Sequence, residues 1–321
     1  MYEAKPLAHY FRNFYARRVL RIFPLYYGYL AAVFLLLPLL AAGANRIAAV
    51  RPQQLWYWLY LQNYLVAWEG DWRHTQLLNH LWSLAIEEQF YMVWPIVVLL
   101  FSRRKLMAIC LAATALSLAF RCILWCAYEV SPVPIYVMTP TRLDGLALGA
   151  WVALAARGPR GVLALLPAAR RTLLLTSVPL GAIFLLQDTF SYHNPWVFTA
   201  GFTLLAAAFA AVLVLTICAA PQSRLGRAMS GRTLRMFGRY SYAMYVFHQP
   251  VIMVVDSVTY RLLPGTDTLT LQIVRYAAVL LLTLVAALAS WNLYEKHFLR
   301  LKRFFHSEKT AVRDSAKTSP S

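Results

Sequence analysis

Charged residues are scarce in this chain of 321 residues. Asp, Glu, Lys and Arg make up 14% of it, whereas 60% of its residues are hydrophobic. Soluble domains carry about 25% charged residues and are about half apolar, so this composition excludes an ordinary soluble fold. The apolar residues gather into windows of about 16 to 23 residues, close to the roughly 20 that a helix needs to cross a hydrocarbon core. We therefore expect membrane-spanning helices.

Acidic residues are scarcer still, because 13 Asp and Glu stand against 31 Lys and Arg and give a net charge of +18. Such an excess can indicate a nucleic-acid partner. Here the basic residues form short clusters between apolar windows, which is the pattern of cytoplasmic loops. We predict a lipid bilayer as partner and no nucleic acid.

Cysteine is also rare. The chain has four cysteines, all within apolar windows and without Cys-x-x-Cys spacing. They are Cys110, Cys122, Cys126 and Cys218. That pattern favours packing over metal binding, so we predict no metal.

The apolar windows predict an all-α, polytopic transmembrane bundle of about eight spans. The spans are placed at 25–42, 81–101, 106–126, 136–156, 172–187, 197–218, 240–256 and 271–293. Segment 53–68 is short, aromatic and rich in amides, which favours a re-entrant or interfacial helix over a ninth span.

The distribution of Lys and Arg orients these spans. With eight spans, 24 Lys and Arg fall in the segments on one side and only four on the other. By the positive-inside rule both termini are cytoplasmic, in an inner (plasma) membrane. We expect a basic cytoplasmic segment at 1–24, a transmembrane domain at 25–304 and a disordered tail at 305–321.

Ionisable side chains inside the predicted spans are candidates for chemistry, because each is costly in a membrane. Glu87 and Glu88 share one span, and Arg142 and Asp144 enter another from the same predicted side. A buried network of Glu and Arg is the functional hypothesis. The alternative is an ion pair that only fixes packing, or charges that snorkel to the headgroups.

Two further features admit a functional and a structural interpretation. His248 lies about two turns into its predicted span, before Pro250, where a histidine can act as a base or simply pack. Arg18 and Arg21 share a helix face at the predicted cytoplasmic mouth. Such a pair can grip phosphates, or it can be an ordinary positive-inside cluster.

Five segments carry a family pattern in order. They are Arg17-Arg18-x-x-Arg21-Ile22-x-Pro24, Trp82-Ser83-Leu84-x-x-Glu87-x-x-Phe90-Tyr91, Arg142-Leu143-Asp144-Gly145, Ser241-Tyr242-x-x-Tyr245-x-x-His248-x-Pro250 and Tyr294-Glu295-Lys296. Each motif alone is weak, but together they resemble the membrane-bound acyltransferase family 3, of the O-acetyltransferase type, from about residue 11 to 304.

This resemblance implies transfer of an acyl group, usually acetyl, from cytoplasmic acyl-CoA to a hydroxyl of a cell-envelope or exported saccharide or lipid-linked acceptor. Acyl-CoA would be the donor substrate, with no permanently bound cofactor. Arg18 and Arg21 match the family's arginine pair for the CoA phosphates, and Glu87 and Arg142 match polar positions nearer the outer face. We take Glu87, Arg142 and His248 as the catalytic candidates.

The beginning of the chain departs from the family. Members normally start with two further spans, the first of which carries the histidine taken as catalytic base. A base is needed because a hydroxyl attacks a thioester readily only when its proton is accepted. We expect an N-terminally truncated chain, in which His80 lies outside the spans and His248 is the only histidine within one.

Two other functions stay open at this point. In a transporter or flippase, Glu87, Arg142 and His248 would line a polar path, although no inverted repeat is visible. The chain could also be an inactive truncated product.

Overall fold

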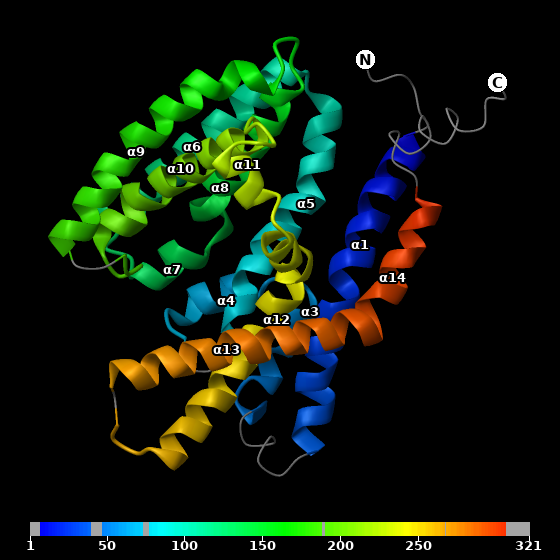
Figure 1. The fold of residues 1–321 in the computed structure, drawn as a ribbon, viewed down its shortest axis with the longest axis vertical. Coiled ribbons are helices and arrows are strands. Elements are labelled where there is room, and N and C mark those ends of the chain that lie inside the picture. Colours follow the sequence, from blue (N-terminus) through cyan, green and yellow to red (C-terminus); the bar gives the residue numbers. More distant parts are fainter. Residues whose placement is uncertain (1–6, 40–46, 73–76, 188–189, 267, 306–321) are drawn as a thin grey trace. The chain divides into compact units, whose positions relative to one another are not determined.

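The computed structural model describes residues 7–39, 47–72, 77–187, 190–266 and 268–305. All regular structure in these residues is helical, as the composition predicted (Figure 1). A helix bonds its backbone N–H and C=O groups within the segment, which is what a lipid environment requires. Apart from Phe305, the predicted disordered tail lies outside the described residues.

Six helical stretches of the described residues are long and apolar enough to cross a membrane. They are His9–Leu39, Asn79–Leu100, Arg103–Cys126, Val162–Gln187, Val197–Ile217 and Leu269–Phe304. The other two predicted spans, 136–156 and 240–256, are helical as well, in α8 (Thr139–Ala156) and α12 (Arg232–Leu262). Polar side chains lower the hydropathy of both helices, so the count of eight spans stays a prediction.

The first predicted span begins inside a longer helix. α1 (Leu7–Ala31) continues through the π-helical segment η1 (Ala32–Leu36) and the 3-10 turn η2 (Leu37–Leu39). The described part of the basic segment predicted at 1–24 is therefore helical and joins the span without a break.

Segment 53–68, by contrast, is not one helix. α3 (Gln54–Trp58) and α4 (Gln62–Glu69) are separated at Tyr60, whose φ is +56°, an outlier for a bulky residue. The amide of Gln62 is buried and donates to the Leu81 carbonyl at 2.7 Å. The buried side chain of Gln62 thus supplies a hydrogen bond to a backbone carbonyl of a neighbouring segment. This is expected of a short buried segment rather than of a lipid-facing span.

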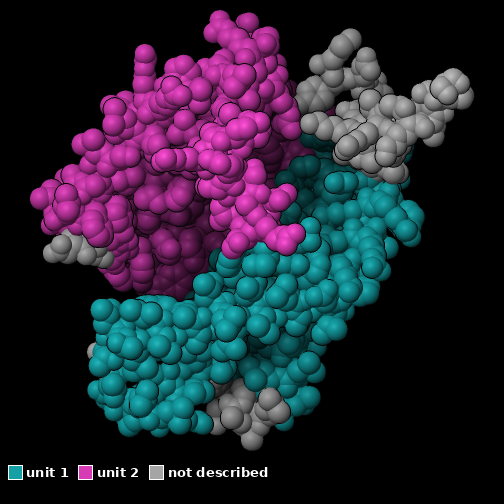
Figure 2. Space-filling view, viewed as in Figure 1, with its two compact units in different colours: residues 1–54, 76–80, 236–321 teal, residues 55–75, 81–235 magenta. Residues whose placement is uncertain are grey.

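The chain divides into two compact units, coloured separately in Figure 2. Unit 1 comprises residues 1–54, 76–80 and 236–321, and unit 2 comprises residues 55–75 and 81–235. Each unit is therefore assembled from segments that are distant in the sequence.

In unit 1, α13 (Leu269–Ser290) continues through the π-helical segment η7 (Trp291–Glu295) into α14 (Lys296–Arg300) and η8 (Leu301–Phe304). α14 lies beside α1 (Figure 1). Two tyrosine hydroxyls tie α1 to this unit, because Tyr242 donates to the Ile22 carbonyl at 2.8 Å and Tyr294 donates to the Pro24 carbonyl at 3.2 Å. These bonds hold α1 against α12 (Arg232–Leu262) and η7.

In unit 2, α8 is the central helix. α6 (Arg103–Cys126) packs on α8, α8 packs on α10 (Phe202–Ile217), and α10 packs on α9 (Leu166–Gln187). Leu106, Cys110, Ala147 and Leu154 fill the space between α6 and α8. Cys110 therefore packs in a core, as predicted.

The remaining elements complete the described residues. In chain order they are η3 (Arg51–Gln53), η4 (Asn79–Leu81), α5 (Trp82–Leu100), α7 (Pro132–Val137), η5 (Val162–Leu165), η6 (Val197–Gly201) and α11 (Arg224–Met229). Of these, η6 is π-helical and leads directly into α10.

Candidate functional site

The start of α8 determines where its two charged side chains point. Pro140 occupies the first turn, where its missing N–H is not needed, and its carbonyl accepts a hydrogen bond from Ser117 of α6 at 2.8 Å. Arg142 and Asp144 follow two residues apart. Side chains at i and i+2 of a helix do not face each other, so these two residues reach different neighbours.

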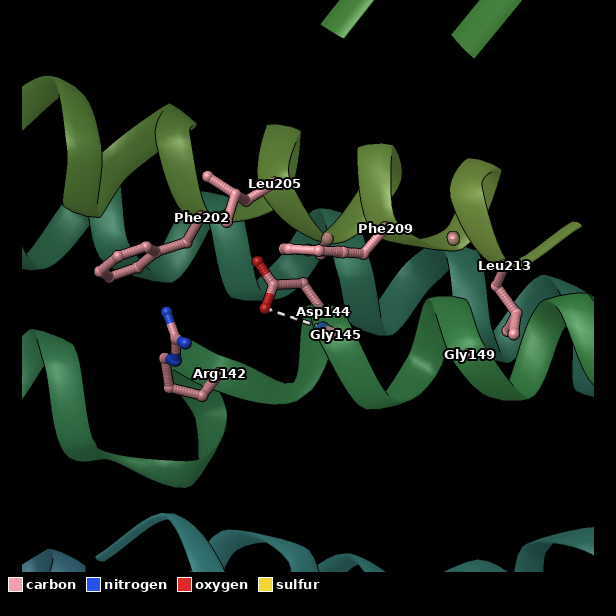
Figure 3. A pocket seen from close by; sticks show the side chains of 10 residues that line it. Arg142, Asp144, Gly145, Gly149, Phe202, Leu205, Phe209 and Leu213 are labelled. Atoms are coloured by element: carbon pink, nitrogen blue, oxygen red, sulfur yellow. Dashed lines mark hydrogen bonds between the residues drawn. The ribbon is translucent and has the colours of Figure 1, made fainter. Parts of the chain in front are cut away.

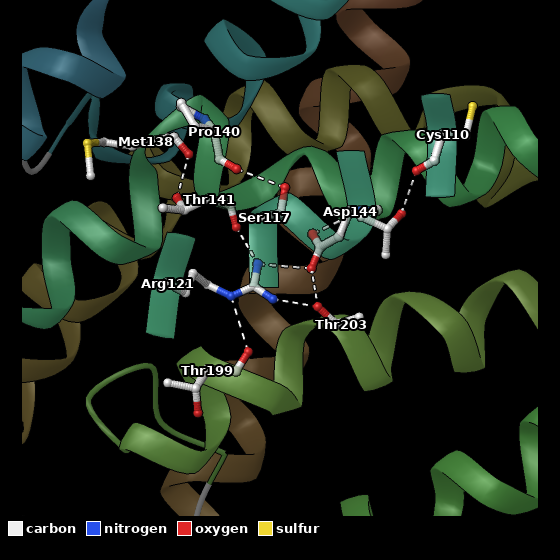
Figure 4. A network of polar contacts seen from close by, with 11 residues as sticks. Cys110, Ser117, Arg121, Met138, Pro140, Thr141, Asp144, Thr199 and Thr203 are labelled. Carbon is white, nitrogen blue, oxygen red and sulfur yellow. Dashed lines mark hydrogen bonds and ion pairs between the residues drawn. The ribbon is translucent and has the colours of Figure 1, made fainter. Parts of the chain in front are cut away.

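Asp144 pairs with Arg121 of α6, which is 0% exposed (Figure 4). The Arg121 Nη1 lies 2.9 Å from Asp144 Oδ2 and also donates to the Thr141 carbonyl. Its Nη2 donates to Thr203 Oγ1 at 2.5 Å, and its Nε donates to the Thr199 carbonyl at 3.2 Å. The guanidinium thus joins α6, α8, η6 and α10.

The carboxylate of Asp144 is fully engaged in this network. Besides Arg121, its Oδ2 accepts from Thr203 Oγ1 at 2.8 Å, and its Oδ1 accepts from the Gly145 N–H at 3.0 Å. A buried ion pair needs such extra bonds to offset desolvation. We therefore interpret Arg121 and Asp144 as the structural charge pair of unit 2.

Arg142 has a different environment. Its Cζ lies 4.1 Å from the ring centroid of Phe202, 5.4 Å from Tyr136 and 6.0 Å from Trp82, within the range of cation–π attraction. Its Nη1 is buried and has no hydrogen-bond partner among the described residues. A buried N–H without a partner is costly and calls for an explanation, and a bound oxygen atom would supply one.

A pocket of about 390 Å³ lies beside Arg142, between α8 and α10 (Figure 3). It is lined by Arg142, Asp144, Gly145, Gly149, Phe202, Leu205, Ala206, Phe209, Ala210 and Leu213. The two charged residues stand at one end, and the rest of the lining is apolar. Its volume falls within the range of small-molecule sites.

The two acidic candidates of α5 differ in burial. Glu88 is 7% exposed, whereas Glu87, the family-matched candidate, is half-buried. One of the pair therefore faces the helix bundle, as expected. Among the described residues, unit 2 also contains a buried ion pair that the sequence did not predict, between Asp144 and Arg121. The predicted network of Glu and Arg stays a prediction.

A second cluster lies in unit 1, around His248. The ring of His80 is 8% exposed and its centroid lies 5.0 Å from that of His248. Tyr245 donates its hydroxyl to the His80 carbonyl, and Tyr29 packs edge-on against the His80 ring at 6.1 Å. The sequence placed His80 outside the spans and left His248 as the only histidine within one. In the structure, η4 brings His80 into the helical stretch Asn79–Leu100, and its ring lies beside that of His248.

Backbone carbonyls determine which ring nitrogen of each histidine carries the hydrogen. His248 Nδ1 lies 2.6 Å from the Tyr245 carbonyl, and His80 Nε2 lies 3.1 Å from the Val246 carbonyl. A carbonyl only accepts, so each of these nitrogens carries the hydrogen. In the neutral rings, His248 Nε2 and His80 Nδ1 therefore hold the lone pairs, and a lone pair is what a general base needs.

Basic residues form a third cluster, also in unit 1. Arg17, Arg18 and Arg21 on α1 all lie within electrostatic reach of Lys302 in η8. Arg17 Nη1 donates to the Phe305 carbonyl at 2.9 Å, and Arg18 lies over the Phe14 ring at 4.7 Å. Like charges held together by the fold favour binding of an anion.

The sequence interpretation missed Arg121, His80 and Lys302. Arg121 stands inside an apolar window of a predicted span, so the charge-cost argument that selected Arg142 applied to it equally. His80 precedes the predicted start of its span by one residue. Lys302 had no local signal, because only the packing of η8 against α1 brings it to the arginines.

The sequence also matches a known protein family. The model of the acyltransferase domain family, acyltransferase 3, matches residues 7–292. The chain therefore belongs to this family, as its motifs predicted, and it is a multi-pass membrane protein, with six helical stretches suited to spanning among the residues that the structure describes.

Its relatives include bacterial O-acetyltransferases. The protein named peptidoglycan O-acetyltransferase YrhL, from Bacillus subtilis (strain 168), is 29% identical over 257 residues, which cover 76% of this chain and 39% of the relative. O-acetyltransferase OatA from Staphylococcus aureus (strain NCTC 8325 / PS 47) is 29% identical over 188 residues, covering 56% of this chain and 30% of the relative.

Peptidoglycan O-acetyltransferase OatA from Listeria monocytogenes serovar 1/2a (strain ATCC BAA-679 / EGD-e) is 32% identical over 189 residues, with 56% of this chain and 30% of the relative covered. The matches thus span less than half the length of these relatives. No solved structure matches the chain.

Proposed function

We propose that the chain is an acyltransferase of the inner (plasma) membrane, with both termini cytoplasmic, that moves an acyl group from cytoplasmic acyl-CoA to a hydroxyl of a cell-envelope saccharide such as peptidoglycan. The family match across residues 7–292 carries this proposal. The relatives' names support an O-linked saccharide acceptor, and the clustering of basic residues supports the orientation.

In this reaction the acceptor hydroxyl oxygen attacks the thioester carbonyl carbon. The hydroxyl loses its proton to a base, the C–S bond breaks, and the thiolate leaves and takes up a proton to give free CoA. The Nε2 lone pair of His248 suits the base, because its Nδ1–H is already committed to the Tyr245 carbonyl. Arg142 belongs to unit 2, where its unpartnered Nη1 suits hydrogen bonding to a substrate oxygen.

The basic cluster of unit 1 suits the phosphates of the donor. Arg18 and Arg21 lie one turn apart on α1, and Lys302 adds a further cation from η8. Arginine binds phosphate through charge-assisted, often bidentate hydrogen bonds. Glu87, half-buried in α5, is left as a candidate for binding the acceptor.

The function is tested with the chain in proteoliposomes, with labelled acyl-CoA, from acetyl- to octanoyl-CoA, on one side and peptidoglycan fragments on the other. We expect label in ester linkage to the glycan and one free CoA released per ester formed. Movement of solute without thioester consumption would identify a transporter instead. If neither ester nor free CoA is produced with any of several saccharide acceptors, the acyltransferase proposal is wrong.

Replacing Arg18 and Arg21 by Gln should raise the KM for acyl-CoA with little change in kcat. Each lost charge-assisted bond costs about 1.5–3 kcal/mol, which corresponds to roughly 10- to 150-fold in affinity. Initial rates at varied acyl-CoA measure the effect. Arg160→Gln, an exposed cation outside both units' clusters, is the control, and an equal rise in KM there would mean that net charge alone attracts the donor.

A further inference from the structure

The pocket between α8 and α10 is larger than an acetyl group needs. An apolar cavity of about 150 Å³ is enough to hold benzene, whereas this pocket measures about 390 Å³. Its α10 wall extends from Phe202 to Leu213, which is about 16 Å at the helical rise per residue. An acetyl group seated at Arg142 would leave most of this length empty.

Two glycines of α8 form the floor of the pocket. Gly145 and Gly149 lie four residues apart on one helix face, a spacing that often brings two helices into close contact. Here a Cβ at either position would have no neighbouring atom within 4 Å among the described residues. These glycines therefore do not serve helix contact within the structure but keep the groove open.

The pocket is polar at one end only. Asp144 is saturated by Arg121, Thr203 and the Gly145 N–H, so the free hydrogen-bonding capacity at that end is the buried Nη1 of Arg142. From there the lining is formed by aliphatic and phenylalanine side chains. The complementary ligand has one carbonyl or anionic oxygen at its head and an alkyl chain behind it.

From this combination we infer that the groove between α8 and α10 is an acyl-chain pocket, with the thioester carbonyl oxygen at Arg142 Nη1 and the alkyl chain running along Gly145 and Gly149 toward Leu213. This inference rests on the proposed acyltransferase function and extends it to the substrate class. The chain then accepts acyl groups of medium length, about eight carbons, in preference to acetyl. The transfer itself is unchanged: an ester C–O bond forms, the thioester C–S bond breaks, and CoA leaves as the thiol.

Chain-length preference is measured as kcat/KM for acetyl-, butyryl-, hexanoyl- and octanoyl-CoA with the full chain in vesicles. Each methylene that enters the pocket should raise kcat/KM about three- to fourfold until the pocket is full. Gly149→Leu places a side chain in the groove and should lower the octanoyl-to-acetyl ratio at least tenfold. Phe209→Ala, at a residue that is 66% exposed, should shift the optimum to longer chains.

Gly181→Leu on α9 is the matched control. A Cβ at Gly181 also has no neighbour within 4 Å, and the residue does not line the pocket. Leu is a better helix former than Gly in all these positions, so loss of helix does not explain an effect of Gly149→Leu. A preference for acetyl that neither variant changes would overturn the inference while leaving the acyltransferase function intact.

A binding readout separates the two proposals further. Octanoyl-CoA with a photoreactive diazirine at the end of its chain should label α10 between Phe202 and Leu213, as mapped by peptide mass spectrometry. Excess octanoyl-CoA should prevent this labelling, and Gly149→Leu should abolish it. Two outcomes would overturn the inference, and neither requires turnover. One is labelling elsewhere in the chain. The other is labelling of α10 that membrane phospholipid prevents and octanoyl-CoA does not, which would show that a lipid chain occupies the groove.

Discussion

Replacing Arg121 by Met should lower the free energy of unfolding by about 3–5 kcal/mol, because the change leaves the Asp144 carboxylate buried without its counter-charge. The methionine fills much of the same space but leaves the Thr141 and Thr199 carbonyls without their donor. Thermal or denaturant unfolding in detergent micelles measures the loss.

Two variants make this prediction specific. Removing both charges in Arg121→Met with Asp144→Leu should recover part of the loss, because a buried pair replaced by apolar residues is often neutral. Arg142→Met should lower stability much less than Arg121→Met, because it removes cation–π contacts together with an unpartnered buried N–H, yet it should lower acyl transfer. If Arg121→Met and Arg142→Met reduce stability equally, the division into a structural and a functional arginine fails.

Composition and hydropathy were sufficient to predict an all-helical membrane protein. Both are sums over many residues, so they do not depend on how any one helix is rotated. That Asp144 needs a partner or a use followed from the cost of a charge inside a predicted span. Its partner was not predictable, since the bond from Asp144 to Arg121 joins α6 to α8 and depends on how these two helices face each other.

The histidine cluster shows where span boundaries limit such predictions. The hydropathy window placed the start of the span at residue 81, and the 3-10 turn η4 (Asn79–Leu81) adds residues that no apolar periodicity marks. His80 lies in that turn. Its approach to His248 joins segments more than 160 residues apart in the sequence, a contact that local pattern does not encode.

The largest effect on catalysis is expected at His248. Replacing it by Gln should lower kcat by about 10²- to 10⁴-fold, the range that general-base catalysis contributes, with little change in the KM for acyl-CoA. The amide of Gln can still donate to the Tyr245 carbonyl, but it has no nitrogen lone pair to accept a proton. Single-turnover transfer to a saccharide measures the chemical step directly. His193→Gln, an exposed residue of unit 2, should retain full activity.

Replacing His80 tests whether His248 is the base or only part of a packed histidine pair. Its Nδ1 lone pair is buried against solvent, so we expect it to hold the His248 ring in place rather than to meet the acceptor. His80→Gln should therefore reduce kcat less than His248→Gln. In His80→Gln, ¹⁵N spectra of His248 should show that its hydrogen is no longer confined to Nδ1 but is shared between the two ring nitrogens. Imidazole added to His248→Gly should restore part of the transfer rate but should not rescue His80→Gly. Equal losses in both variants, with no rescue of either, would mean that the pair serves packing and that the base lies elsewhere.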